Sequence, residues 1–334
     1  MAMEYYQQRA SVAGTLLITE ATIISPRAGG VANMPGIYSE DQIKAWRSIT
    51  DAVHEKGSFI VCQLIALGRA ADPTILKQDG YRHIGPSAVP IKDRPVPEEM
   101  TEAEIGYIIN DFATAAQNAI TAGFDAVEVH GANGYLVDQF FHDTSNLRSD
   151  NWGGSVTGRA RFGLEVVKSI IHAIGAAKVG FRISPWNIWQ SMEMDDPNPQ
   201  FEYFVHQLSK LGIAYLHVIE SRVLSNFDCE ERGSILPFLE TWAKTNPSPV
   251  LVAGGFNPEN VADKLDDEYR NHNVAVVFGR HFLANPDLPF RLKNGISLEK
   301  YDRSTFYARE ERRGYIDYPF SPEFVKQYKK GQAS

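Results

Sequence analysis

Stretches with the pattern of buried strands alternate with stretches of helical periodicity along nearly the whole chain. The strand-like stretches are short, apolar and rich in β-branched residues, as in parallel sheets that helices cover on both faces. The expected strands are Leu16–Glu20, Phe59–Leu64, Ala126–Val129, Val179–Ile183, Tyr215–Ile219, Val250–Ala253 and Val274–Phe278. The expected helices are Glu40–Lys56, Thr101–Gly123, Thr157–Ala173, Pro199–Leu211, Ser234–Lys244 and Pro258–Glu268.

This order predicts an α/β fold of the TIM (β/α)₈-barrel type. Seven strands can be counted, one fewer than a closed barrel of this kind requires. No linker or low-complexity segment divides the sequence, and a single α/β barrel routinely exceeds ~200 residues. We therefore expect residues 1–334 to form one domain.

Composition narrows the range of functions. The net charge of -8 argues against a nucleic-acid partner, and 43% hydrophobic residues can supply a large core. No apolar run approaches the ~20 residues of a membrane helix, and the first ten residues lack a signal-peptide core. Only two cysteines occur, Cys62 and Cys229, so a disulfide framework is not expected and a cytoplasmic location fits. No metal site is predicted.

Three polar side chains follow the expected strand at Ala126. These are His130, Asn133 and Tyr135, and the glycines between them allow a sharp turn. The carboxyl ends of strands are where α/β proteins place their chemistry, so we interpret the three as a candidate active site. The alternative is a strand whose last residues only cap a neighbouring loop.

Two late strands end in glycine. Gly255 and Phe256 follow one of them, and Gly279 and Arg280 follow the other. The loops after the last two strands of a barrel commonly bind phosphate, since glycine frees backbone N–H groups to approach the oxygens. Arg280 would add a bidentate partner. The alternative is that the glycines only form two tight turns and that Arg280 is a surface residue.

Two further polar residues belong to expected strands, namely Gln63 and Arg182. A buried arginine must be paired or face a ligand, because an isolated buried charge is costly. Together with a glutamine it suits a planar heterocycle with carbonyl and imide edges. A structural ion pair of Arg182 with Glu128 or Glu220 is the alternative.

Several motifs make the sequence resemble the old yellow enzyme family, its fungal members above all. The likeness covers the whole chain and includes Glu4–Ser11, Ile18–Thr22, Gln63–Arg69, His130–Leu136, Ser145–Phe162, Arg182–Pro185, Gly279–Arg280 and Asn285–Leu288. The resemblance implies an FMN-containing barrel in which NADPH reduces the flavin. The reduced flavin then passes a hydride to the β-carbon of an activated alkene.

The resemblance also assigns roles to the residues found above. His130 and Asn133 would bind the carbonyl or nitro oxygen of the substrate, and Tyr135 would protonate the α-carbon. Residues expected to hold FMN are Gln63 and Arg182 at the ring, and Gly255, Phe256, Gly279 and Arg280 at the phosphate. Residues expected to line the substrate pocket are Ile65, Trp186, Trp189 and Tyr307.

The sequence departs from the family pattern in two places. It begins just after the position of the family's first barrel strand, which contacts the flavin. A trimmed start, a natural loss with flavin retained, and a loss of flavin function would each give this pattern. Ile65 stands where the family often has tryptophan, which would enlarge the pocket or be a neutral core exchange.

Three functions are compatible with these features. The first is an FMN- and NADPH-dependent ene-reductase acting on a small molecule of fungal secondary metabolism, as a monomer or homodimer. The second is a non-redox double-bond isomerase, in which the same donors polarise a carbonyl while Tyr135 or a carboxylic acid moves a proton. The third is a catalytically inactive binding or scaffold protein.

Overall fold

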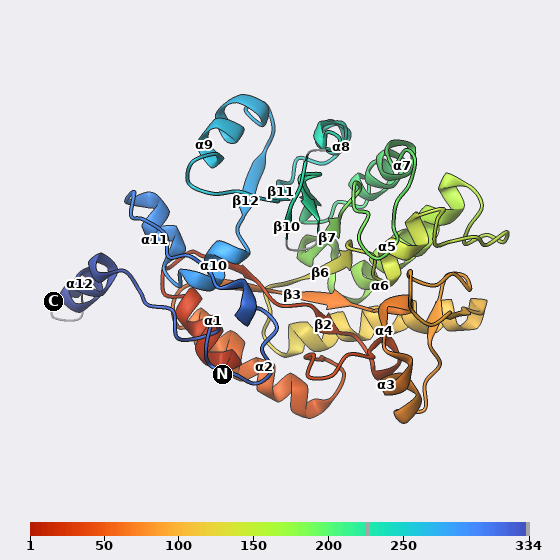
Figure 1. Cartoon of the computed structure of the whole chain (residues 1–334), viewed down its shortest axis with the longest axis horizontal. Coiled ribbons are helices and arrows are strands. Elements are labelled where there is room, and N and C mark those ends of the chain that lie inside the picture. The colour runs from red at the N-terminus through yellow and green to blue at the C-terminus, as the bar shows by residue number, and fades with distance from the viewer. Residues whose placement is uncertain (225–226, 231, 332–334) are drawn as a thin grey trace.

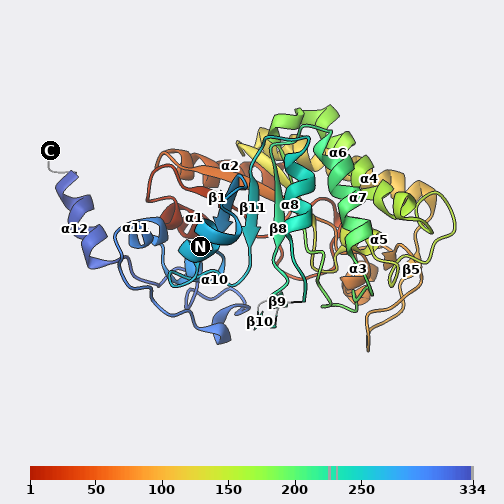
Figure 2. The ribbon, with the colours of Figure 1, turned by 90° about the horizontal axis from the view of Figure 1, so that it is seen from above.

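The computed structural model describes residues 1–224, 227–230 and 232–331. A curled parallel sheet lies at its centre, and helices surround it on the outside (Figures 1 and 2). Its strands follow in the order β1 (Leu16–Ile18), β3 (Phe59–Ile65), β6 (Ala126–Gly131), β7 (Val179–Ile183), β8 (Tyr215–Ile219), β11 (Val250–Ala253) and β12 (Val274–Val277). All seven predicted strands are present, and the predicted α/β barrel type is confirmed.

An eighth strand shares one side of β3 with β1. Strand β2 (Thr22–Ile23) pairs with the end of β3, while β1 pairs with its beginning. Between them the hydroxyl of Thr19 accepts a hydrogen bond from the Gln63 N–H at 3.0 Å. The two short strands therefore occupy one position of the sheet. Within the described residues β12 does not pair with β1, so the sheet has two edges.

The larger helices pack side by side around the sheet. They are α2 (Glu40–His54), α4 (Glu102–Thr121), α6 (Val156–Ile174), α7 (Asn198–Ser209) and α8 (Leu236–Ala243). The sequence predicted each of these with small shifts at the ends. The predicted helix Pro258–Glu268 is different, because it consists of a single turn α9 (Val261–Asp263) followed by a π-helical turn η4 (Lys264–Glu268). The Asn257 and Asn260 side chains bond to nearby backbone and close a turn before it.

Shorter elements complete the chain. The helices are α1 (Ala2–Arg9), α3 (Pro73–Gln78), α5 (Leu136–Phe141), α10 (Arg280–Ala284), α11 (Leu288–Lys293) and α12 (Pro322–Gly331), with 3-10 turns η1 (Pro26–Ala28), η2 (Gly68–Ala70), η3 (Ala176–Lys178) and η5 (Arg303–Thr305). Two small sheets pair β4 (Ile84–Gly85) with β5 (Glu98–Glu99) and β9 (Val223–Leu224) with β10 (Phe227–Asp228). No helix in the described part of the chain is long and apolar enough to span a membrane.

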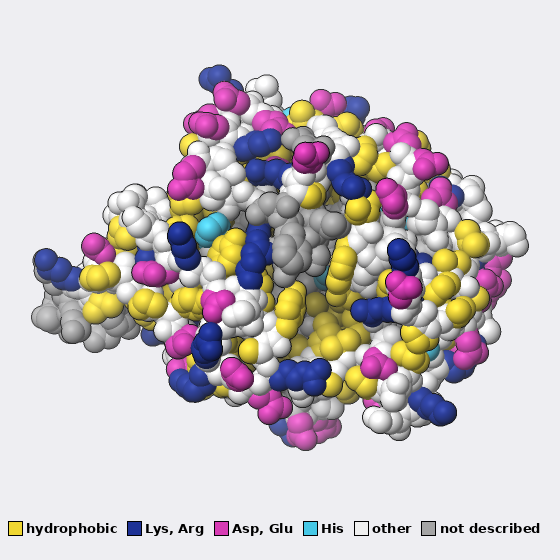
Figure 3. Space-filling model, viewed as in Figure 1, with side chains coloured by type: hydrophobic (Ala, Val, Ile, Leu, Met, Phe, Trp, Pro, Cys, Tyr) yellow, Lys and Arg dark blue, Asp and Glu magenta, His cyan; other side chains and the backbone are white. Residues whose placement is uncertain are grey.

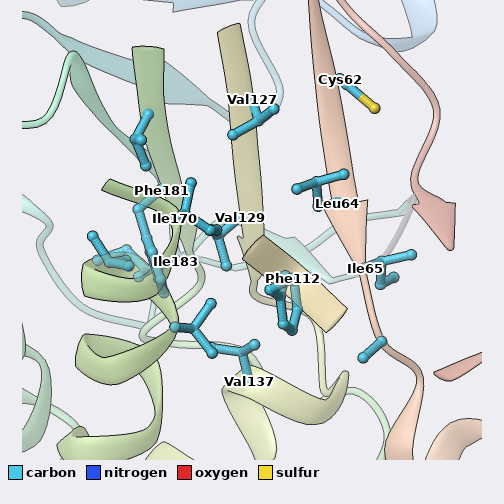
Figure 4. Packing of buried hydrophobic residues seen from close by; sticks show 14 of the residues in the cluster. Cys62, Leu64, Ile65, Phe112, Val127, Val129, Val137, Ile170, Phe181 and Ile183 are labelled. Atoms are coloured by element: carbon cyan, nitrogen blue, oxygen red, sulfur yellow. The ribbon is translucent and has the colours of Figure 1, made fainter. Parts of the chain in front are cut away.

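The main core lies between the strands and the surrounding helices (Figure 4). Val127 and Val129 of β6 and Phe181 of β7 meet Phe112 of α4 and Ile170 of α6, and all five are fully buried. Burying each such side chain contributes about 1.5–3 kcal/mol. This packing fixes β6 and β7, the strands whose ends carry most of the candidate site.

Helix α4 begins with a capping box. The hydroxyl of Thr101 accepts from the Glu104 N–H, while the Glu104 carboxylate accepts from the Thr101 N–H. We expect Thr101→Ala to lower the free energy of unfolding by ~1 kcal/mol, because an orphan N–H of the first turn loses its partner. Urea denaturation measures the change. Thr101→Ser keeps the hydroxyl and is the control; equal stability of all three proteins would contradict the expectation.

Candidate active site

A tight turn directly follows His130 at the end of β6. Asn133 and Gly134 have positive φ angles of 56° and 77°, which asparagine and glycine adopt more easily than other residues. A Cβ atom at Gly134 would lie 2.8 Å from the Cβ of Gln190. The Asn133 N–H donates to Ser184 Oγ at 2.7 Å, and the Asn133 carbonyl accepts from Gln190 Nε2 at 2.8 Å. These bonds hold the turn against the chain that follows β7.

His130 is a buried, neutral imidazole. Burial and, next in weight, the charge of Arg182 lower the pKa of His130 to about 3. Its Nδ1 accepts a long hydrogen bond of 3.4 Å from the Ala132 N–H. The single proton of the neutral ring is therefore on Nε2, and the side chain can act as an N–H donor without a charge change near neutral pH.

The low pKa of His130 has a measurable consequence. The imidazole takes up a proton near pH 6.5 in the unfolded chain but only near pH 3 in the folded one. The contribution to stability is therefore complete above pH 6.5 and is lost progressively as the pH falls towards 3. We expect NMR titration to show no His130 protonation between pH 5 and 8, and His130→Asn to flatten the acid side of the stability profile. A His130 titration midpoint near 6.5 would contradict this.

Tyr135 lies beside His130. Their ring centroids are 5.1 Å apart in an edge-to-face arrangement, and the Trp189 and Tyr135 centroids are 6.3 Å apart, also edge to face. Burial raises the pKa of Tyr135, and the nearby Tyr307 raises it further. The phenol is thus protonated at neutral pH and can donate a proton. The structure brings the predicted donor and the predicted proton source to the same strand end.

Arg94 is a charged neighbour of Tyr135 that the sequence did not single out. Its charge counteracts the rise in the pKa of Tyr135. The guanidinium also donates to the Ala70 carbonyl at 3.3 Å, which ties the loop between α3 and α4 to η2. The only sequence signal was the length of this Pro- and Asp-rich loop, since loops of that length are often functional.

The residues predicted to line the substrate pocket differ in placement. Trp189 and Tyr307 are exposed by 38% and 80% and lie near Tyr135. Trp186 donates from Nε1 to the Ser234 carbonyl at 3.2 Å and so packs against the chain before α8. Ile65 is fully buried in the core beside β2. Contact of any of the four with a substrate stays a prediction.

Gln63 of β3 and Glu128 of β6 are directly opposite each other in the sheet. The Gln63 amide donates from Nε2 to one Glu128 oxygen at 2.6 Å, and Nδ1 of His217 on β8 bonds to the other at 2.9 Å. Burial alone would raise the pKa of Glu128, but His217, Arg182 and the Gln63 hydrogen bond outweigh it and lower the pKa to about 2. The carboxylate is therefore charged.

Arg182 of β7 is in register with both His130 and His217. In the described chain no ion pair within 4.0 Å joins it to Glu128 or Glu220. Burial lowers the pKa of Arg182, and the charge of Glu128 counteracts this shift. The Arg182 Nε is buried and has no hydrogen-bond partner in the part of the chain that the structure describes. Gln63, Arg182 and His217 line a cavity of about 670 Å³ that extends outward between β1 and β12. On the face of the molecule seen in Figure 3, a hollow has hydrophobic side chains at its floor and both basic and acidic side chains around it.

The two predicted glycine turns lie side by side. They follow β11 and β12, which are paired in parallel with Ala253 opposite Val277. Gly255 has a φ of 60°, and apart from the chain neighbours of Gly279 no described atom lies within 4 Å of the place where a Cβ of that residue would stand. The Arg280 guanidinium lies 5.7 Å from the centre of the Tyr301 ring. The Gly279 turn leaves room for a ligand, and phosphate binding at the two turns stays a prediction.

His217 was missed in the sequence because it lies in an otherwise apolar strand. A lone histidine there is usually a satisfied core residue. The available signal was the position of the polar residues. Three successive predicted strands each contain one polar residue at an inward position, namely Glu128, Arg182 and His217. Only the placed strands show that Arg182 is opposite His217 and that His217 bonds to Glu128.

Comparisons with known proteins agree on one family. A sequence model described as the NADH:flavin oxidoreductase / NADH oxidase family matches residues 1–299. A chanoclavine-I aldehyde reductase of Penicillium roqueforti is 52% identical over 97% of this chain and 88% of its own length. A probable inactive reductase of Epichloe festucae var. lolii is 48% identical over 98% of this chain and 87% of its own.

Solved structures agree with the sequence matches. An old yellow enzyme from a Pichia species superimposes with a TM-score of 0.88 at 37% sequence identity. The alignment covers 96% of this chain and 84% of that enzyme.

Proposed function

This chain belongs to the NADH:flavin oxidoreductase / NADH oxidase family, as an old-yellow-enzyme-type barrel, and from that premise we propose that it is an ene-reductase. The substrate is an α,β-unsaturated carbonyl compound whose C=C bond takes up one hydride and one proton. When bound, FMN supplies the hydride, which comes from NADPH. In balance, NADPH, a proton and the alkene give NADP⁺ and the saturated carbonyl compound.

The proposal is supported by the contact between the His130 and Tyr135 rings at the end of β6, with Asn133 in the turn between them. The His130 Nε2–H and the Asn133 amide can both donate to the carbonyl oxygen of a substrate. They stabilise the negative charge that develops there as the β-carbon is attacked. The phenol of Tyr135, kept protonated by burial, donates a proton to the α-carbon.

The residues beneath this site fit FMN. A flavin ring has an imide N–H and carbonyl oxygens along one edge. Gln63 and His217 can accept from such an N–H, and Arg182 can donate to the oxygens. The glycine turns at Gly255 and Gly279 suit a phosphate group.

The names of relatives suggest the substrate. A protein of Penicillium roqueforti that is 52% identical is named for an aldehyde, so we propose an unsaturated aldehyde of fungal secondary metabolism. We further propose a monomer or homodimer in the cytoplasm. The free thiols of Cys62 and Cys229 fit that compartment.

A specific observation keeps the isomerase as a second candidate. One relative at 48% identity is named a probable inactive reductase. A chain this similar can therefore lack reductase activity, even though His130, Asn133 and Tyr135 are present here. An isomerase needs the carbonyl donors and a proton carrier but no hydride. The product would then have the same mass as the substrate.

One experiment separates these functions. Purified protein is mixed with FMN, its visible absorption is recorded, and trans-2-hexenal or 2-cyclohexenone is offered with and without NADPH. The proposal expects bound flavin, NADPH-dependent turnover and a product heavier by two hydrogens. Turnover without NADPH at unchanged mass, tested with a β,γ-unsaturated aldehyde, would replace it by the isomerase. Absence of both flavin binding and turnover would leave only a binding protein.

A further inference from the structure

One buried carboxylate organises the polar groups on the floor of the cavity. Glu128 is fully buried, and its two oxygens are taken by two different partners, Gln63 and His217. Those partners come from β3 and β8, on opposite sides of β6 and β7. The ring of Tyr215, also on β8, lies over Gly180 and close to the Glu128 carboxylate. It therefore closes this side of the carboxylate to water.

The carboxylate determines which end of the Gln63 amide faces the cavity. An ionised carboxylate can only accept hydrogen bonds, so the Gln63 NH₂ must be the end directed at Glu128, at 2.6 Å. The reverse orientation would bring two oxygens together. The carbonyl oxygen of Gln63 is consequently left as an acceptor in a residue that lines the cavity.

The same reasoning applies to the ring of His217. Burial lowers the pKa of His217 by more than the contact with Glu128 raises it, so the ring is neutral near pH 7 and carries one proton. The bond to the carboxylate keeps that proton on Nδ1. Nε2 then holds a lone pair, and it is buried without a hydrogen-bond partner among the described residues. Because an unsatisfied buried acceptor is costly, it points to a ligand with an N–H group.

We propose that Glu128 is a positioning residue that turns two hydrogen-bond acceptors, the Gln63 carbonyl oxygen and His217 Nε2, towards a ligand in the cavity beside the Arg182 cation. The ligand class is a planar heterocycle with an imide N–H next to carbonyl oxygens. Its identification with the flavin ring rests on the proposed function, whereas the orientation itself rests on the contacts above. The negative charge of Glu128 also reduces the field that Arg182 exerts on the ligand.

Glu128→Gln tests the proposal. The new amide has one accepting oxygen in place of two, so only one neighbour keeps its orientation. Reversal of either Gln63 or His217 puts an N–H where an acceptor had been, and FMN affinity should fall about tenfold. The midpoint potential of bound FMN should become more positive, because Arg182 loses its counter-charge and favours the anionic reduced ring.

The control is Asp287→Asn. Asp287 is another fully buried carboxylate, bonded to Arg291 and Ser321 outside this network. The Asp287→Asn change should alter the stability of the protein without changing the midpoint potential of bound FMN. Unchanged FMN affinity and potential in Glu128→Gln, or the same changes in Asp287→Asn, would overturn the proposal.

A measurement without flavin separates this inference from the proposed function. Long-range ¹⁵N–¹H NMR on histidine-labelled protein reports the tautomer of His217, assigned with a His217→Gln variant. We expect a neutral ring protonated on Nδ1. An Nε2–H ring or an imidazolium would overturn the inference even if FMN binds. Failure of the wild-type protein to bind FMN would overturn the proposed function while this result still decides the inference.

Discussion

Replacement of Tyr135 by phenylalanine is expected to slow alkene reduction by roughly 10²–10⁴-fold, the usual contribution of a positioned general acid. The change removes one hydroxyl and keeps the ring that contacts His130 and Trp189. Protonation of the α-carbon then depends on water. Gas chromatography of the saturated product measures the loss, and stopped-flow reduction of the flavin by NADPH should be unaffected.

A control must show that the effect depends on the position of the Tyr135 hydroxyl and not on the loss of any tyrosine hydroxyl. Tyr107→Phe removes the same group from an exposed tyrosine on α4 and should leave turnover unchanged. If Tyr135→Phe also retains full turnover, the phenol is not the proton source. Arg94 and a bound water would then be the groups to examine.

Replacement of His130 by leucine is expected to lower kcat/KM for an unsaturated aldehyde by roughly 10²–10³-fold, the loss seen when one preorganised donor to a developing oxyanion is removed. The imidazole is neutral and its Nε2 carries the proton, so the loss is that of a hydrogen bond and not of a positive charge. The effect should therefore be the same at pH 6 and pH 8.

A conservative change gives the matched comparison. His130→Asn places an amide N–H near the same position and should recover part of the lost rate. His54→Leu alters a partly exposed histidine on α2 and should have no effect. A rate loss in His130→Leu that grows as the pH falls from 8 to 6 would show that the imidazolium, and not the neutral ring, is the working form.

The sheet was predictable because most of its strands are short apolar runs, and the central ones are almost completely buried. Val250–Ala253 and Val179–Ile183 are continuous apolar or nearly apolar runs, and the structure has both with the predicted ends. The final predicted helix was wrong in length because asparagine side chains close a turn over residues 257–260. Hydrophobic periodicity does not report such local competition between side chain and backbone.

The site was predictable only in part. Polar residues at the end of a buried strand stand out, as His130 and Tyr135 do. Their partners inside the barrel are visible only after the strands have been placed in register. His217 resembles a core histidine until Glu128 and Arg182 are seen beside it, and Trp186 could not be placed because its partner is a backbone carbonyl.

The two ends of the candidate site differ in how firmly the sheet holds them. His130 and Arg182 belong to strands paired on both sides, whereas Gly279 and Arg280 follow β12, which pairs only with β11 in the described chain. Local opening requires less free energy at such a margin than in the middle of a sheet. A ligand that contacts both ends of the candidate site would therefore stabilise the edge strand β12 more than the central strands. Part of its binding free energy would then appear as increased stability of the fold.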